Sequence, residues 1–289
     1  NLHQIQFKDQ IKLRAMETRE HSWLPIPITV SLILLGWVIA RLVPSEGPEV
    51  AFQILGSPLG LRFTPAFWIG IFSAALAATG TESLLQFHPR FREEAPWRQI
   101  GRLIPSIWVA VGGLTFTLQL PLSPLWLIGL GLGGAALTLA MLGERYRLET
   151  TGVSRLMTPL LTQALIYLVT LAAIVWIFQS GLRTLVLMLI SGILAAGLAL
   201  ARLVEAEIPE RRRWLYVALI GWSMATVAAA FRYWTLSAVT LGLWWMILLY
   251  ELVEMSLWHL QGRVLSPRVA VEFGSLGFLI ALLARWVAG

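Results

Sequence analysis

The feature that most constrains this chain is a series of nine apolar segments separated by short polar stretches. The hydrocarbon core of a bilayer is about 30 Å thick, and a helix needs about 20 apolar residues to cross it. Backbone groups in lipid must be hydrogen-bonded within the segment, so each segment is expected to be a helix. The sequence therefore predicts an all-α, polytopic transmembrane helical bundle of about nine spans, or eight if one segment is re-entrant. The predicted spans are Trp23–Val43, Pro65–Phe87, Ile100–Leu118, Pro124–Leu142, Pro159–Phe178, Leu182–Val204, Trp214–Tyr233, Leu236–Leu252 and Pro267–Val287.

The composition excludes a water-soluble fold. The chain is 57% hydrophobic and only 13% charged, whereas soluble domains carry about 25% charged residues. The net charge of +6 comes mainly from arginines at the ends of the apolar segments. This placement indicates membrane orientation rather than binding of nucleic acid. The chain contains no cysteine, so disulfides and thiolate metal sites are excluded.

Four predicted spans begin with a hydroxyl residue followed by proline. A serine or threonine at the N-cap accepts a backbone hydrogen bond, and proline suits the first helical position because no partner for its N–H is needed there. These pairs predict helix starts at Thr64-Pro65, Ser123-Pro124, Thr158-Pro159 and Ser266-Pro267.

The arginines favour one orientation. They concentrate in alternate loops, and positively charged loops face the cytoplasm. We therefore expect a cytoplasmic segment over residues 1–22, a single transmembrane domain over residues 23–289 and a C-terminus outside the cytoplasm. The external loop 44–64 has two apolar stretches around a Gly-Ser-Pro turn, which indicates a short hairpin. The expected location is a cell membrane, with the prokaryotic inner membrane favoured.

The stretch GLGLGG, Gly129–Gly134, matches the dinucleotide-binding pattern G-x-G-x-x-G. That pattern requires a preceding strand and an exposed helix N-terminus, whereas these glycines lie inside a predicted span. We interpret them as sites of close helix packing, like Gly192 and Ala196.

The stretch EEAPWR, Glu93–Arg98, resembles the E-E-x-x-x-R pattern that opens the active site of CAAX-type intramembrane proteases. That family also requires two histidine motifs within helices, and only MSLWH, ending at His259, is distantly comparable. Pro96 would also interrupt a helix that carried the glutamate pair. We interpret this stretch as a charged cytoplasmic loop.

Several ionisable residues lie within spans or close to their ends, where a charge is costly and is by default a candidate functional site. Glu251 and Glu254 share a helix face near the predicted end of the eighth span and require a positive partner. Glu82 could pair with Arg102 across a helical hairpin. These residues either form ion pairs that stabilise the helix packing or make up a proton or substrate site. The candidate cluster consists of Glu82, Arg102, Glu251, Glu254, His259, Arg263, Arg268 and Glu272.

The run Arg211, Arg212 and Arg213 is predicted to bind anionic lipid headgroups. The chain has only four histidines, in tails and loop edges, and one aspartate. These few histidine and aspartate residues indicate no metal site and no set of catalytic residues, and any cofactor is unknown.

Three functions remain open at this point. The inventory favours a non-catalytic membrane subunit or scaffold of a larger complex, with membrane lipids and other membrane protein subunits as partners. The alternatives are a transporter of small or lipidic molecules that uses intramembrane glutamates, and a membrane-embedded enzyme that acts on lipid-linked substrates.

Overall fold

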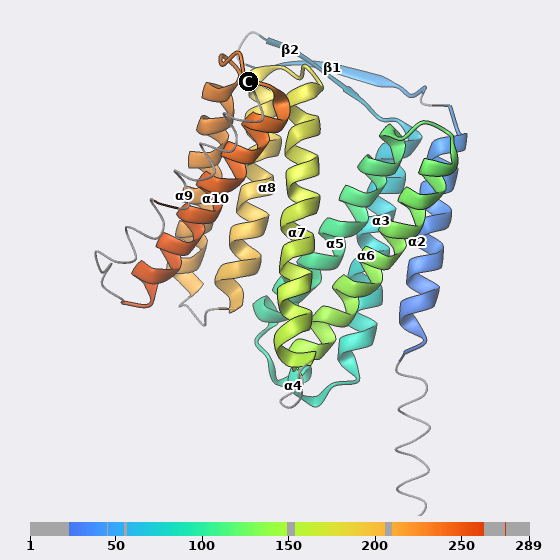
Figure 1. Cartoon of the computed structure of the whole chain (residues 1–289), viewed down its shortest axis with the longest axis vertical. Coiled ribbons are helices and arrows are strands. Elements are labelled where there is room, and N and C mark those ends of the chain that lie inside the picture. Colours follow the sequence, from blue (N-terminus) through green and yellow to red (C-terminus); the bar gives the residue numbers. More distant parts are fainter. Residues whose placement is uncertain are drawn as a thin grey trace, which may run out of the picture. The chain divides into compact units, whose positions relative to one another are not determined.

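The computed structural model describes residues 23–44, 46–54, 57–148, 154–205, 210–262 and Ser275. Most of these residues are helical, and Figure 1 shows the helices in sequence order from blue to red. The elements are α2 (Pro25–Leu42), β1 (Glu49–Ile54), β2 (Ser57–Arg62), α3 (Pro65–Gln86), α4 (Pro89–Glu93), α5 (Pro96–Gln119), α6 (Pro124–Leu148), α7 (Ser154–Gln179), α8 (Thr184–Glu205), α9 (Glu210–Phe231) and α10 (Ala238–Leu260).

Eight helices in the described part of the chain are long and apolar enough to cross a membrane. They are α2, α3 and α5 to α10, and each corresponds to a predicted span. The predicted all-α polytopic bundle is therefore confirmed. The predicted ninth span, Pro267–Val287, and the predicted cytoplasmic segment 1–22 lie outside the described residues.

Of the three predicted helix starts that lie within the described residues, two are found. The Thr64 hydroxyl accepts a hydrogen bond from the Phe67 backbone N–H at 3.3 Å, and α6 begins at Pro124. The predicted start at Pro159 is wrong, because α7 begins at Ser154. A proline this close to a helix N-terminus removes only one backbone hydrogen bond, so the helix can start earlier. The Ser266-Pro267 signal lies outside the described residues.

The helices group into two compact units. The first unit contains residues up to 95 together with residues 105–165, and the second contains residues 96–104 together with those from 166 onward. The single transmembrane domain expected over residues 23–289 stays a prediction.

In the first unit, α2 packs against α3 and α6, and the Trp37 side chain of α2 is fully buried. Glycines make room for its indole ring. A Cβ atom added at Gly113 of α5 would lie 2.2 Å from Trp37 Cη2, and one at Gly133 of α6 would lie 2.5 Å from Cζ3. A Cβ at Gly134 would meet Leu34, whereas one at Gly131 would have no neighbour within 4 Å. The interpretation of GLGLGG as a packing segment is confirmed at Gly133 and Gly134.

In the second unit, α8 and α9 make the most extensive contact, and α10 packs against both. At the crossing of α8 and α9, a Cβ added at Gly192 would lie 3.1 Å from the Gly221 carbonyl oxygen. A Cβ at Gly221 would lie 3.0 Å from the Cβ of Ala196. The small residues predicted to allow close packing therefore do so. On α10, the buried Trp245 donates its indole N–H to the Met224 carbonyl of α9 at 3.2 Å.

The strands β1 and β2 form an antiparallel pair in the register Glu49 opposite Arg62 and Ile54 opposite Ser57. They are the two blue arrows in Figure 1. Both strands lie within residues 44–64, the loop in which the sequence indicates a hairpin.

Candidate functional site

The two glutamates of α10 lie deeper in their helix than the sequence indicates. The predicted span ends at Leu252, but α10 continues to Leu260 and closes at Gly262, whose φ is 66°. Between Leu252 and Gly262 the sequence contains no proline or glycine that would end the helix earlier. At 1.5 Å per residue, Glu251 lies about 13 Å and Glu254 about 9 Å before the last residue of α10. Both carboxylates are therefore inside a membrane-spanning helix and not at its end.

Glu254 is paired with an arginine of this chain. Arg202 on α8 places both Nε and a terminal guanidinium nitrogen 3.1 Å from Glu254 Oε1. The side chains are 32% exposed for Arg202 and 13% exposed for Glu254. Tyr250, one turn before Glu254, packs its ring edge to face against Tyr167 of α7 at a centroid distance of 6.2 Å. The ion pair ties α8 to α10 with a tyrosine pair beside it.

Glu251, in contrast, makes no hydrogen bond or ion pair with any residue that the structure describes. Its side chain is half-buried. It is the preceding carboxylate on α10, about one turn from the paired Glu254. The two glutamates therefore have different surroundings, although the sequence treats them as one pair.

The other members of the predicted cluster are only partly described. His259 is exposed, and its ring lies 6.1 Å from the Tyr216 ring of α9. The remaining three, Arg263, Arg268 and Glu272, lie outside the described residues, so their predicted pairing with the glutamates stays a prediction.

Glu82 is exposed, one turn before the end of α3, and it accepts a hydrogen bond from Gln86 Nε2 at 3.1 Å. Arg102 is half-buried on α5. Glu82 belongs to the first unit and Arg102 to the second. The predicted pair between them stays a prediction.

The run Arg211–Arg213 does not form one surface. Arg211 and Arg212 are exposed at the start of α9, whereas Arg213 is fully buried. The Arg213 guanidinium carbon lies 3.5 Å from the centroid of the Trp97 ring, which is a cation–π contact. Arg213 is thus packed inside the second unit, and binding of headgroups by Arg211 and Arg212 stays a prediction.

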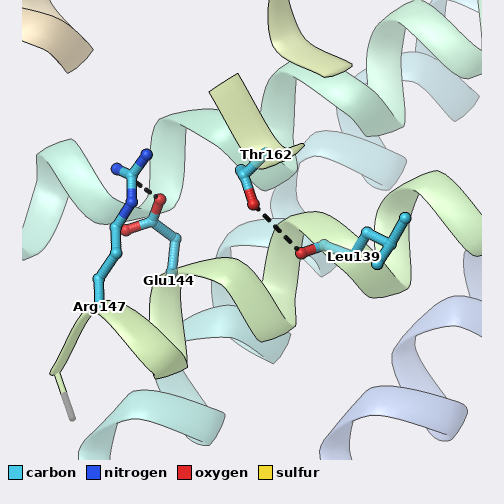
Figure 2. A network of polar contacts seen from close by, with 4 residues as sticks. All are labelled: Leu139, Glu144, Arg147 and Thr162. Carbon is cyan, nitrogen blue, oxygen red and sulfur yellow. Dashed lines mark hydrogen bonds and ion pairs between the residues drawn. The ribbon is translucent and has the colours of Figure 1, made fainter. Parts of the chain in front are cut away.

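A further polar group near the end of α6 was missed by sequence reasoning. The predicted span ends at Leu142, but α6 continues to Leu148 and contains Glu144, which is 1% exposed. Arg147 lies one turn further on, with a guanidinium nitrogen 3.0 Å from Glu144 Oε1 (Figure 2). The spacing of three residues between opposite charges was the available signal.

Thr162 of α7 contributes to the same region. A Cβ added at Gly143, next to Glu144, would overlap the Thr162 hydroxyl. This hydroxyl donates to the Leu139 carbonyl at 3.5 Å, as Figure 2 shows. Gly143 therefore lets the start of α7 approach α6 closely.

Arginines of the first unit also bind carbonyls at helix ends, where the last carbonyls lack partners within the helix. Arg41 of α2 donates to the carbonyls of Leu118 and Leu120 at the end of α5, both at 3.1 Å. The short helix α4 supplies two more contacts, from Arg90 to the Leu148 carbonyl at 3.4 Å and from Arg92 to the Gln86 carbonyl at 3.0 Å. The positive charge of arginine also suits the negative end of a helix dipole.

Among the residues that the structure describes, no three histidine or carboxylate side chains gather closely enough to hold a metal ion. The arrangement shows ionic and cation–π contacts between helices, together with Glu251, a carboxylate within α10 that has no partner among the described residues.

The eight apolar helices make the chain a multi-pass membrane protein. Residues 45–287 match the model of a family described as a protein of unknown function (DUF5656), and the chain belongs to this family. No curated protein and no solved structure matches the chain.

Proposed function

We propose that the protein is a non-catalytic integral membrane subunit or scaffold of a larger membrane complex. The observation that carries the proposal is that its charged side chains form hydrogen bonds and an ion pair that hold helices together. Arg41, Arg90 and Arg92 bind carbonyls at helix ends. Arg202 joins α8 to α10 through Glu254. Contacts of this kind fix the positions of helices, which is what a subunit that holds other components requires.

The faces that such a subunit would offer to lipid or to other proteins are apolar. Large side chains are exposed along the spans, for example Leu132 at 64% on α6 and Trp222 at 69% on α9. Membrane lipids and other membrane protein subunits are the partners that this surface fits, and the expected location is a cell membrane, with the prokaryotic inner membrane favoured.

The proposal is tested by purifying the tagged full chain in a mild detergent and measuring the mass of the particle. We expect the chain to elute with other membrane proteins at fixed stoichiometry, and to do so after a second purification step through a tag on the partner. A chain that elutes alone from every mild detergent and from native membrane discs contradicts the proposal.

A second candidate function is transport of a small or lipidic molecule, and the depth of Glu251 favours it. A carboxylate about 13 Å from the helix end is in a position to carry a proton or bind a cation. Reconstituted vesicles provide the test: a Glu251→Gln variant should abolish flux of protons or cations. Equal leak in vesicles with wild-type protein, variant protein and no protein excludes this candidate.

A further inference from the structure

Glu251 differs from the other acidic side chains described within the spans. Glu254 is bound by Arg202, Glu144 by Arg147, and Glu82 accepts a hydrogen bond from Gln86. Glu251 has no such contact with a described residue, although it is half-buried and lies about 13 Å inside α10. A lone charge at that depth is costly unless a cation or a hydrogen-bond donor meets it.

We propose that Glu251 is the docking point for a basic side chain, arginine or lysine, on a transmembrane helix of a partner protein that packs along α10. The inference rests on the proposed function as a membrane subunit and names the chemistry of the partner. A basic side chain is the expected partner because a carboxylate within a span is stabilised by a positive charge at its own level, and no described residue supplies one.

Among the residues that the structure describes, the face of α10 that carries Glu251 is the less covered one. Leu248, Glu251, Met255 and His259 follow one another at intervals of three or four residues and therefore share a face. Met255 is 39% exposed, His259 is exposed, and the other two are half-buried. The opposite face is buried within the second unit, at Trp245, Leu249, Val253 and Ser256. Within the described part of the chain, one side of α10 is thus packed, and the other carries Glu251 between Leu248 and Met255.

The described basic side chains near this face make other contacts. Arg202 directs two nitrogens to a single oxygen of Glu254. His259 lies about 12 Å further along α10 and contacts the Tyr216 ring. Arg263 and Arg268 lie outside the described residues, and a cross-link to residues 263–289 would identify the partner within this chain. A basic residue on the helix of a partner protein can meet the carboxylate at its own level along α10.

The surroundings also suit a helix contact. Met255, one turn from Glu251, has a flexible thioether side chain that adapts to different partner surfaces. Polar contacts between helices in a membrane are modest, and their loss changes association by about three- to twentyfold. Glu251 would therefore set the position and choice of partner, while the apolar face supplies the contact area.

The experiment uses the full chain in its native membrane, with the photoreactive residue p-benzoylphenylalanine in place of Met255. We expect ultraviolet light to produce one adduct with a membrane protein, cross-linked at a helix that carries arginine or lysine, as identified by peptide mass spectrometry. The matched control places the same residue at Ile193, which is 59% exposed on α8 and should give no such adduct.

Charge is then tested directly. Glu251→Gln preserves the shape of the side chain and one acceptor oxygen but removes the negative charge, and it should lower the adduct yield about three- to twentyfold. Glu251→Arg should abolish it, and a glutamate at the identified basic residue of the partner should restore it. Unchanged thermal unfolding of Glu251→Gln shows that this variant keeps the fold. If Glu251→Arg does not fold, the partner's basic residue is replaced with a neutral one instead. This change should restore the adduct yield of the Glu251→Gln variant.

Any one of three results overturns the inference. The first is an adduct within residues 263–289 of the same chain, the second is an adduct only with lipid, and the third is a Glu251→Gln variant that cross-links as well as the wild type does. If a complex purifies intact but does not depend on Glu251, the inference fails and the proposed function stands. If no complex forms at all, the proposed function itself fails.

Discussion

Arg202 and Glu254, 52 residues apart in the sequence, join α8 to α10 through two contacts of 3.1 Å to the same carboxylate oxygen. Removing one partner of such a pair leaves the other charge inside a mainly apolar bundle. Fully buried pairs lose about 3–5 kcal/mol in this way. Because the Arg202 side chain is 32% exposed, we expect a smaller loss.

Glu254→Gln and Arg202→Gln should each lower the free energy of unfolding by about 1–3 kcal/mol. The double variant should lose less than the sum of the two, because the interaction can be lost only once. Unfolding followed by circular dichroism in detergent measures these losses. Glu82→Gln, at an exposed carboxylate, is the control and should change stability little; additive losses would show that the two residues do not interact.

The contact between Arg213 and Trp97 gives a second prediction. Trp97→Ala removes the ring against which the buried guanidinium packs and should destabilise the second unit by about 2 kcal/mol. Trp97→Phe keeps an aromatic face and should lose less. Arg212→Gln should leave stability unchanged because Arg212 is exposed. If Arg212→Gln and Trp97→Ala have equal effects, the cation–π contact does not contribute to stability.

The packing of Trp37 against glycine gives a third prediction. Gly133→Ala places a methyl group within van der Waals radii of the indole and should cost about 1–3 kcal/mol. Gly131→Ala, two residues earlier on the same helix, meets no atom within 4 Å and should be neutral or slightly stabilising because alanine favours helix. Trp37→Phe should relieve part of the loss in Gly133→Ala. Equal stabilities of the two alanine variants would contradict the packing.

The predicted orientation can be tested with single cysteines, because the chain contains none. Glu93→Cys lies before α5 and Leu122→Cys after it, and both positions are exposed. A maleimide that cannot cross membranes should label Leu122→Cys on intact cells and Glu93→Cys only after permeabilisation. The reverse pattern would mean that the arginine-rich loops face outward.

Hydropathy alone predicted the eight described spans, because the requirement for about 20 apolar residues in helical form is set by the bilayer. The helix ends were less predictable. Charged residues at Glu144 and Glu254 looked like boundaries, yet α6 and α10 continue past them. Arg147 and Arg202 form ion pairs with these glutamates. Because the paired charges are tolerated, the helices continue beyond the last run of apolar residues.

The partners in the candidate site could not be predicted from the sequence for a different reason. Spacing along one helix relates residues three or four positions apart, but Arg202 and Glu254 meet only because of how α8 and α10 pack. In the same way, three consecutive arginines look equivalent in the sequence, and only the position of Trp97 separates Arg213 from its two neighbours.

The burial of Trp37 between Gly113 and Gly133 has a consequence for biogenesis. Gly133 is translated about 100 residues after Trp37, an interval of about 5–20 s at ordinary elongation rates. Throughout that time α2 has no completed pocket for its indole ring. The first unit can close around Trp37 only after α6 has been synthesised, so the final packing of α2 is reached well after its own synthesis.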